Sequence, residues 1–501
     1  MRTKRALYNT VASLFLQFVT IGTGLILPPL IIGTFGSETN GLLNSITQFL
    51  KHIALLEAGV GPVTKAALYK PLVTKDDKQL KAILNTATIF FKKIALIFIA
   101  YIIILVLIFP LLSETNFDWL FISSLILINA ISTFFQYYFG ITYSLLLQAD
   151  QKLYISNLIQ ISTLTLNAIC ILILINLGSG IHIITLVSSL IFVSRPLILS
   201  YYVKKHYKID KIETTETVKL EQKWDALVQH IANVIRSSSG VLVLTIFATL
   251  TEVSIFSVYN MVVMALRGIV LTFSSGIGAV FGSMIANGEW KKLNRTFKIY
   301  EFITSSVSIV FFTTAGLLII PFMHIYTRNF TDANYIRPLF AYLLITSVAI
   351  YCMRTPYTSI VTASGKFRET NKGAFIEAFI GLALSVILVI NFGMIGVAIG
   401  ATIAIVYRMI DLSCFASRRI LKRALTIFFK RIFVSIVNVF LIIIVVVNLF
   451  PSLNPSTYLN WTLYGVIIFL ISSIITITLA LVFYRHEFQK IIMKLKRVIK
   501  A

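Results

Sequence analysis

Apolar residues dominate this chain in long runs, and short polar clusters separate one run from the next. Most runs hold about 20 residues, the length that an α-helix needs to cross the hydrocarbon core of a bilayer. The pattern therefore predicts an all-α, polytopic membrane protein with about fourteen transmembrane helices. Their predicted limits are 8–33, 41–64, 84–111, 119–147, 153–176, 181–203, 226–249, 254–286, 299–326, 336–363, 370–391, 394–416, 427–450 and 458–484.

Composition agrees with this pattern. The 501 residues are 57% hydrophobic and only 13% charged, and the mean hydropathy is +0.88. A water-soluble protein of this length would carry far more polar surface. The three cysteines all lie in apolar runs without pairing or metal-ligand spacing, so they predict neither a disulfide nor a zinc site.

The distribution of basic residues predicts the orientation. Connections after even-numbered spans are rich in Lys and Arg, as in KKHYKIDKIETTETVKLEQK and SRRILKRALTIFFKR, and both termini are basic. Connections after odd-numbered spans are short, and of the 44 Lys and Arg only Arg328 and Arg337 fall there. The positive-inside rule therefore predicts that both termini are cytoplasmic. The net charge of +24 is then explained by topology and by attraction to anionic headgroups, without nucleic acid.

The two halves of the chain share weakly similar segments at an offset of about 215 residues, which indicates a parallel repeat of six helices. EAGVGPV aligns with SSGIGAV, and LLLQADQKLYISN aligns with SIVTASGKFRETN. A two-lobed bundle of this kind predicts a central cavity and alternating access. The predicted divisions are a six-helix lobe (1–203), a charged cytoplasmic linker (204–225), a second six-helix lobe (226–416), and two additional helices with a basic tail (417–501).

Four cations fall deep inside predicted spans: Lys51, Arg236, Arg267 and Arg354. Lys51 lies roughly 21 Å along the helix from the cytoplasmic cluster at Lys65, too far for easy snorkelling. Charged residues at such depth are costly and face the bundle interior. A surplus of cations suits an anionic ligand, phosphate in particular. The alternative for each is a structural pair or a contact with a backbone carbonyl.

Other polar residues in the spans have two interpretations each. His52 either packs or handles protons, and Glu57 either couples ions or bonds a helix end. Gln17 either lines the cavity or bonds a neighbouring helix. Arg195 and Arg408 are expected to snorkel or to be paired, and the spacing of Arg408 and Asp411 places these two on one helix face.

Catalysis has little support, because no histidine cluster, glycine-rich phosphate loop, HExxH or GxSxG pattern is present. We predict neither an enzyme nor a cofactor nor a metal.

Two segments, NGLLNSITQFLKHIALLEAGVGPVTKAALYKPL and YSLLLQADQKLYISN, resemble the polysaccharide-biosynthesis flippases that export capsule or O-antigen repeat units. These flippases belong to the multidrug/oligosaccharidyl-lipid/polysaccharide exporter superfamily, and the resemblance covers essentially the whole chain. It implies two six-helix lobes, a bacterial cytoplasmic membrane and an undecaprenyl-pyrophosphate-linked oligosaccharide as substrate, with capsule-assembly proteins as candidate partners. The cationic cavity of that family would be formed here by Lys51 and Arg267, with Arg236 and Arg354 as additions.

The chain departs from the related lipid II flippases, which place basic residues in the first span. Only polar Gln17, Thr20 and Thr23 occur there, which argues against lipid II as the substrate. Three other functions stay open. A multidrug or cation antiporter would need deep carboxylates in the first or seventh span, where none is found, a membrane enzyme would need longer outer loops, and a scaffold of capsule assembly would need no cavity cations.

Overall fold

The computed structural model describes residues 2–57, 60–112, 115, 117–207, 224–272, 277–451 and 453–484. In this part of the chain the helices are joined by turns and short irregular segments, and no β-strand is present. The predicted all-α class is therefore confirmed.

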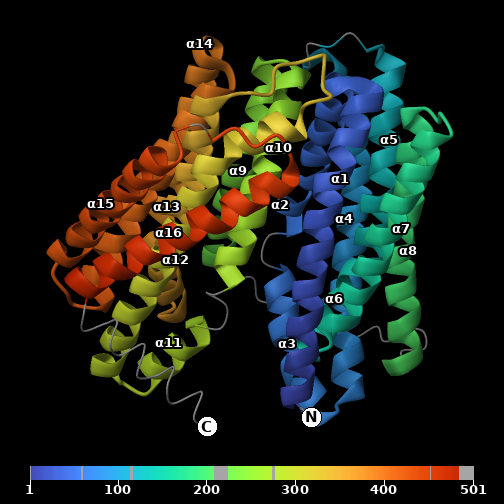
Figure 1. The fold of residues 1–501 in the computed structure, drawn as a ribbon. Helices are drawn as coiled ribbons and strands as arrows, with labels where there is room; N and C mark the ends of the chain where they lie inside the picture. Colours follow the sequence, from blue (N-terminus) through green and yellow to red (C-terminus); the bar gives the residue numbers. More distant parts are fainter. Residues whose placement is uncertain are drawn as a thin grey trace. The chain divides into compact units, whose positions relative to one another are not determined.

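Most helices of the first half are long, and short ones occur between them (Figure 1). They are α1 (Arg2–Lys51), α2 (Ala54–Glu57), α3 (Val60–Thr74), α4 (Asp77–Leu112), α5 (Trp119–Phe135), the π-helical turn η1 (Gln136–Gly140), α6 (Ile141–Ala149), α7 (Leu153–Asn176), α8 (Ile181–Tyr207) and α9 (Trp224–Phe247).

The second half has the same character, and in it α15 and α16 lie side by side (Figure 1). Its helices are α10 (Leu250–Thr272), α11 (Ile277–Ala286), α12 (Trp290–Tyr326), α13 (Pro338–Ala363), α14 (Phe367–Phe415), the π-helical turn η2 (Ala416–Ile420), α15 (Thr426–Leu449) and α16 (Tyr458–Phe483).

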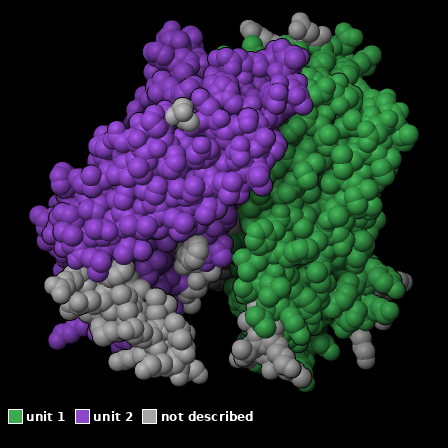
Figure 2. All heavy atoms as spheres, viewed as in Figure 1, with its two compact units in different colours: residues 1–258 green, residues 259–501 purple. Residues whose placement is uncertain are grey.

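The chain forms two compact units, residues 1–258 and residues 259–501, shown in green and purple in Figure 2. The boundary falls inside α10, so α9 and the first turns of α10 group with the helices before them. The predicted linker at 204–225 lies mostly outside the described residues, and the lobe limits at 203, 226 and 416 stay predictions.

Eleven helices in the described residues are long and apolar enough to cross a membrane. Two of them, Leu7–Glu57 and Arg368–Ile420, have 51 and 53 residues, about twice the length of one span. Each contains one glycine with non-helical backbone angles, Gly36 (φ 84°) in α1 and Gly393 (φ 54°) in α14. When each is counted as two spans and α9 is added, the helices match the predicted number of about fourteen.

Two helices begin earlier than the hydropathy pattern predicts. α4 starts at Asp77 rather than 84, and α12 starts at Trp290 rather than 299. Their first turns are polar or basic, DKQLKAI and WKKLNRT. Hydropathy reports only the part of a helix that suits lipid, whereas the backbone hydrogen bonds continue into the polar region.

The helix α4 shows how one element serves both core and lipid. Its buried side, which includes Phe91, Phe98 and Phe109, recurs at helical spacing and packs in the core of the first unit. Its opposite side exposes Ile103 (57%) and Leu107 (56%). A soluble protein would not leave such an apolar face bare, so this face suits contact with acyl chains.

Candidate functional site

The second predicted span is broken at the position of Lys51. Helix α1 ends at this residue, a turn follows, α2 spans only Ala54–Glu57, and α3 begins at Val60. The Lys51 side chain is exposed and makes no hydrogen bond or ion pair with any described residue. Within the described residues, this membrane span therefore carries a cation without an anionic partner next to an interruption of the helix.

His52 and Glu57 lie in and just after that break. The Nδ1 atom of His52 is 3.3 Å from the carbonyl oxygen of Phe49. Its Nε2 atom is buried and has no hydrogen-bond partner among the described residues. The side chain of Glu57 is hydrogen-bonded to that of Tyr137 in η1. Glu57 therefore links α2 to the π-helical turn of another span, and the coupling role of both residues stays a prediction.

Two further predicted site residues belong to the first unit. Gln17 is half-buried in α1. Arg236 in α9 is also half-buried, and its Nη2 donates a hydrogen bond of 2.7 Å to Oδ1 of Asn233, one turn earlier. Their substrate roles stay predictions.

In the second unit, Arg267 of α10 lies against an aromatic ring. Its guanidinium carbon is 4.0 Å from the ring centroid of Tyr351 in α13, and its Nη1 is 3.5 Å from Sδ of Met264. Among the described residues no carboxylate pairs with Arg267. The Tyr351 ring also accepts the guanidinium of Arg354, 4.7 Å from the centroid. Such cation–π contacts orient a guanidinium without neutralising it.

Arg354, unlike Arg267, is paired. Its Nη1 donates to Oε1 of Glu377 at 2.6 Å, and Nε of Arg408 lies 3.6 Å from the other Glu377 oxygen. Arg408 also donates from Nη1 to Oδ2 of Asp411 at 2.6 Å, which confirms the pairing predicted from their spacing. The two arginines and two carboxylates form a charge-balanced network. Within the described residues the structure thus gives Arg354 a carboxylate partner that sequence reasoning did not identify.

A second buried carboxylate, Glu301 of α12, joins three elements. Arg423, between η2 and α15, donates two hydrogen bonds of 2.8 Å to its two oxygens. Nη1 of Arg431 in α15 is 2.9 Å from Oε2, and the Tyr357 hydroxyl of α13 also donates to Glu301. Burial acts to lower the pKa of Arg423, but its hydrogen bonds and ion pair with Glu301 prevail and raise this pKa above its ordinary value. The sequence signal was limited to the position of Glu301 near the end of a span.

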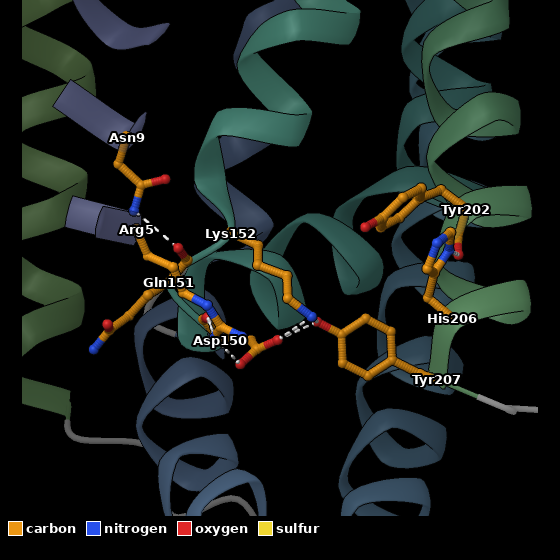
Figure 3. Close-up of polar contacts among 8 residues, drawn as sticks. All are labelled: Arg5, Asn9, Asp150, Gln151, Lys152, Tyr202, His206 and Tyr207. Atoms are coloured by element: carbon orange, nitrogen blue, oxygen red, sulfur yellow. Dashed lines mark hydrogen bonds and ion pairs between the residues drawn. The ribbon is translucent and has the colours of Figure 1, made fainter. Parts of the chain in front are cut away.

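The QADQK turn, one of the segments that carry the resemblance, joins three helices at the predicted cytoplasmic end of the first unit (Figure 3). Asp150 accepts hydrogen bonds from Nη1 of Arg5 at 3.1 Å and from the hydroxyl of Tyr207 at 2.5 Å. It also pairs with Nζ of Lys152 at 2.7 Å. Asn9 donates to the carbonyl of Gln151 at 3.0 Å.

The charge state of Asp150 follows from these contacts. Partial burial acts to raise its pKa, but the hydrogen bonds from Lys152 and Tyr207 and the charges of Lys152 and Arg5 prevail. The pKa of Asp150 therefore lies below its ordinary value, and the carboxylate is ionised at neutral pH. The turn thus holds the N-terminal part of α1 against the ends of α6 and α8.

No group of three or more His, Cys, Asp or Glu side chains in the described part of the chain could hold a metal ion. The chemistry that the predicted site offers consists of cationic and hydrogen-bonding contacts. These suit binding of an anion.

The long apolar helices define a polytopic all-α membrane protein. Its fold is similar to that of lipid flippases and multidrug transporters. Over 96% of this chain and 99% of the other, the structure is similar to a lipid II flippase MurJ in an inward closed conformation, with a TM-score of 0.68 and 16% identity. It is also similar to an inward-facing multidrug resistance MATE family transporter of the MOP superfamily, with a TM-score of 0.61 and 14% identity over 81% and 94% of the two chains.

A third similar structure is a Vibrio cholerae MATE transporter, with a TM-score of 0.53 and 14% identity over 84% and 99% of the two chains. No protein-family model matches the sequence, and no curated protein matches it either. At such low identities these likenesses establish the fold and leave the substrate open.

Proposed function

We propose that this protein is a flippase for a lipid-linked oligosaccharide. Its substrate would be a polysaccharide repeat unit on undecaprenyl pyrophosphate, carried from the inner to the outer leaflet of a bacterial cytoplasmic membrane. The observation that carries the proposal is Lys51, a cation at an interruption of a membrane-spanning helix that has no carboxylate partner among the residues that the structure describes. A pyrophosphate would offset the cost of keeping that charge in a low-dielectric region.

Arg267 supports the same chemistry from the second unit. It is fixed on the Tyr351 ring at 4.0 Å, and its charge is left available for a phosphate. Arg354 shares this ring while it pairs with Glu377. We therefore assign Arg354 the role of holding Tyr351 beneath Arg267. Arg236 and Gln17 of the first unit complete the proposed set of substrate contacts.

The mechanism that follows from these roles is alternating access. The headgroup enters a cavity open to the cytoplasm while the polyprenyl tail stays in lipid, and rocking of the lobes then exposes the headgroup outside. His52 and Glu57 are the proposed sites of proton or ion coupling, because both can change charge next to the helix break.

The test is headgroup translocation in proteoliposomes with a labelled undecaprenyl-pyrophosphate oligosaccharide. We expect Lys51→Ala and Arg267→Ala each to reduce the initial rate about ten- to hundred-fold, the worth of one hydrogen bond to a charged group. The matched controls Lys93→Ala in α4 and Arg418→Ala in η2 remove exposed cations and should keep the wild-type rate.

Wild-type transport that survives the loss of both Lys51 and Arg267 would contradict the proposed phosphate site. The fold of MATE transporters supports one second candidate, a multidrug or cation antiporter. Wild-type protein that moves ethidium and leaves the oligosaccharide in place would favour that function.

A further inference from the structure

The first unit contains a polar cavity that the proposed function does not use. It has a volume of about 340 Å³ and lies among α5, η1, α6, α7 and α8. Hydroxyl and amide side chains and one guanidinium line it together with the apolar side chains of Ile159, Phe192 and Leu199, and the lining includes no carboxylate. The polar residues that matter for its chemistry are Ser132, Gln136, Ser144, Ser156, Gln160 and Arg195.

Arg195 is held in place but is not satisfied. Its Nε donates a hydrogen bond of 2.5 Å to Oγ1 of Thr163 in α7. Its guanidinium carbon lies 4.2 Å from the ring centroid of Phe192, one turn earlier in α8. Its Nη2 is buried and has no hydrogen-bond partner among the described residues. Arg195 was expected to snorkel or to be paired, and the structure gives it a hydrogen bond to the Thr163 hydroxyl. Its Nη2 donor remains without a partner among the described residues.

The local backbone brings Gln136 and Arg195 to the same cavity. Gly140 ends the π-helical turn, and a Cβ atom at this position would meet Cβ of Pro196 at 2.9 Å and Oε1 of Gln136 at 3.0 Å. The missing side chain lets η1 pack directly against α8 beside Arg195. π-Helical turns inside α-helices frequently occur at functional sites.

We propose that this cavity binds a small oxyanion group with a single negative charge, dihydrogen phosphate or a phosphodiester. One guanidinium with a free donor matches one negative charge. Its volume corresponds to roughly ten water molecules, which exceeds the need of a halide ion and leaves room for a polar body. Hydroxyl and amide groups around Arg195 can then bond the remaining oxygens of such a ligand.

The lining of this cavity shares no residue with the proposed substrate contacts, which are Lys51, Arg267, Arg236 and Gln17. The inference does not rest on the proposed function. Two sources could supply the same chemistry, a free anion such as inorganic phosphate and the phosphodiester headgroup of an anionic lipid.

The first experiment follows thermal unfolding of the purified full chain in neutral detergent with inorganic phosphate, against KCl at equal ionic strength. We expect phosphate to raise the midpoint of the wild type by a few degrees, and to leave the midpoint of Arg195→Gln unchanged. Lys204→Gln is the matched control, because it removes an equal charge from an exposed position on the same helix. It should respond as the wild type does.

A second pair of variants keeps the test valid if Arg195→Gln does not fold. Ser156→Ala and Gln160→Ala retain the charge and remove one hydrogen-bonding group each, so each should weaken phosphate binding about ten-fold. Equal phosphate shifts in the wild type, Arg195→Gln and these two variants would overturn the proposal.

The lipid source is tested in nanodiscs of phosphatidylcholine with or without phosphatidylglycerol. If the headgroup fills the cavity, phosphatidylglycerol will stabilise the wild type but not Arg195→Gln, and added phosphate will have no further effect. If a free anion fills it, phosphate alone will act. An absence of both effects in the wild type would overturn the proposal.

Discussion

At the residue scale, the charged side chains carried by the helices divide into two groups, those with a partner of opposite charge and those without. Glu301 and Glu377 are buried and are each shared between arginines from other parts of the second unit. Lys51 and Arg267 have no carboxylate partner among the described residues. A paired buried charge stabilises the fold only while its partner is present. An unpaired charge within a membrane span is costly, so its presence indicates contact with a ligand or a structural role.

Glu301→Gln should be strongly destabilising. The change leaves Arg423 and Arg431 without their counter-charge in a buried place, which costs about 3–5 kcal/mol when one partner of a buried pair is removed. Chemical unfolding of the purified protein would measure the loss. The control is Glu289→Gln, whose exposed pair with Lys292 should contribute less than about 1 kcal/mol. Equal effects of the two substitutions would show that the Glu301 network does not stabilise the second unit.

At the element scale, interruptions in the helices are what distinguish this chain from a bundle of straight rods. Gly36 and Gly393 turn the chain where two spans would otherwise merge, and the helix stops at Lys51. The π-helical turn η1 lies beside both Glu57 and the Arg195 cavity. Backbone irregularity inside a membrane is tolerated where protein surrounds it or where it lines a cavity, so these positions are functional candidates.

Gly36→Ala should destabilise the first unit by about 1–3 kcal/mol, because its angles (φ 84°, ψ 164°) belong to a region that only glycine adopts without strain. Thermal unfolding would report the change. Gly33→Ala, three residues earlier in regular helix with nothing within 4 Å of the added Cβ, should be neutral or stabilising. A Gly36→Ala variant as stable as Gly33→Ala would contradict the turn geometry.

At the scale of the whole molecule, the exposed apolar surface indicates contact with lipid, and the distribution of charge predicts the orientation in the membrane. Basic residues gather in alternate connections, and large apolar side chains such as Phe18 (70%) and Phe379 (73%) are exposed on the helices. Lipid can cover such faces, and the basic connections predict which side faces the cytoplasm.

The predicted orientation can be tested with single cysteines in a variant whose three native cysteines, Cys170, Cys352 and Cys414, are replaced by alanine. We expect Asn329→Cys, in the exposed turn after α12, to react with an impermeant maleimide in intact cells. Lys205→Cys, exposed near the end of α8, should react only after permeabilisation. The reverse pattern would place the termini outside.

The sequence by itself determined the features that depend on local composition. Long apolar runs fixed the helical class and the number of spans, because a backbone in lipid must satisfy its own hydrogen bonds. The alternation of basic connections predicted the orientation, and the spacing of Arg408 and Asp411 was enough to identify their pair. The predicted deep cations were found on helices, but their partners were not evident from the sequence.

Only the tertiary structure decided which charges are compensated. Arg354 meets Glu377, and Arg423 meets Glu301 across 122 residues of sequence, whereas the cavity beside Arg195 needs five elements to form. A charge–charge interaction depends on distance in space, and the hydropathy of a sequence does not indicate which helices become neighbours. The break after Lys51 likewise appears only when backbone angles are known, since the apolar run continues through it.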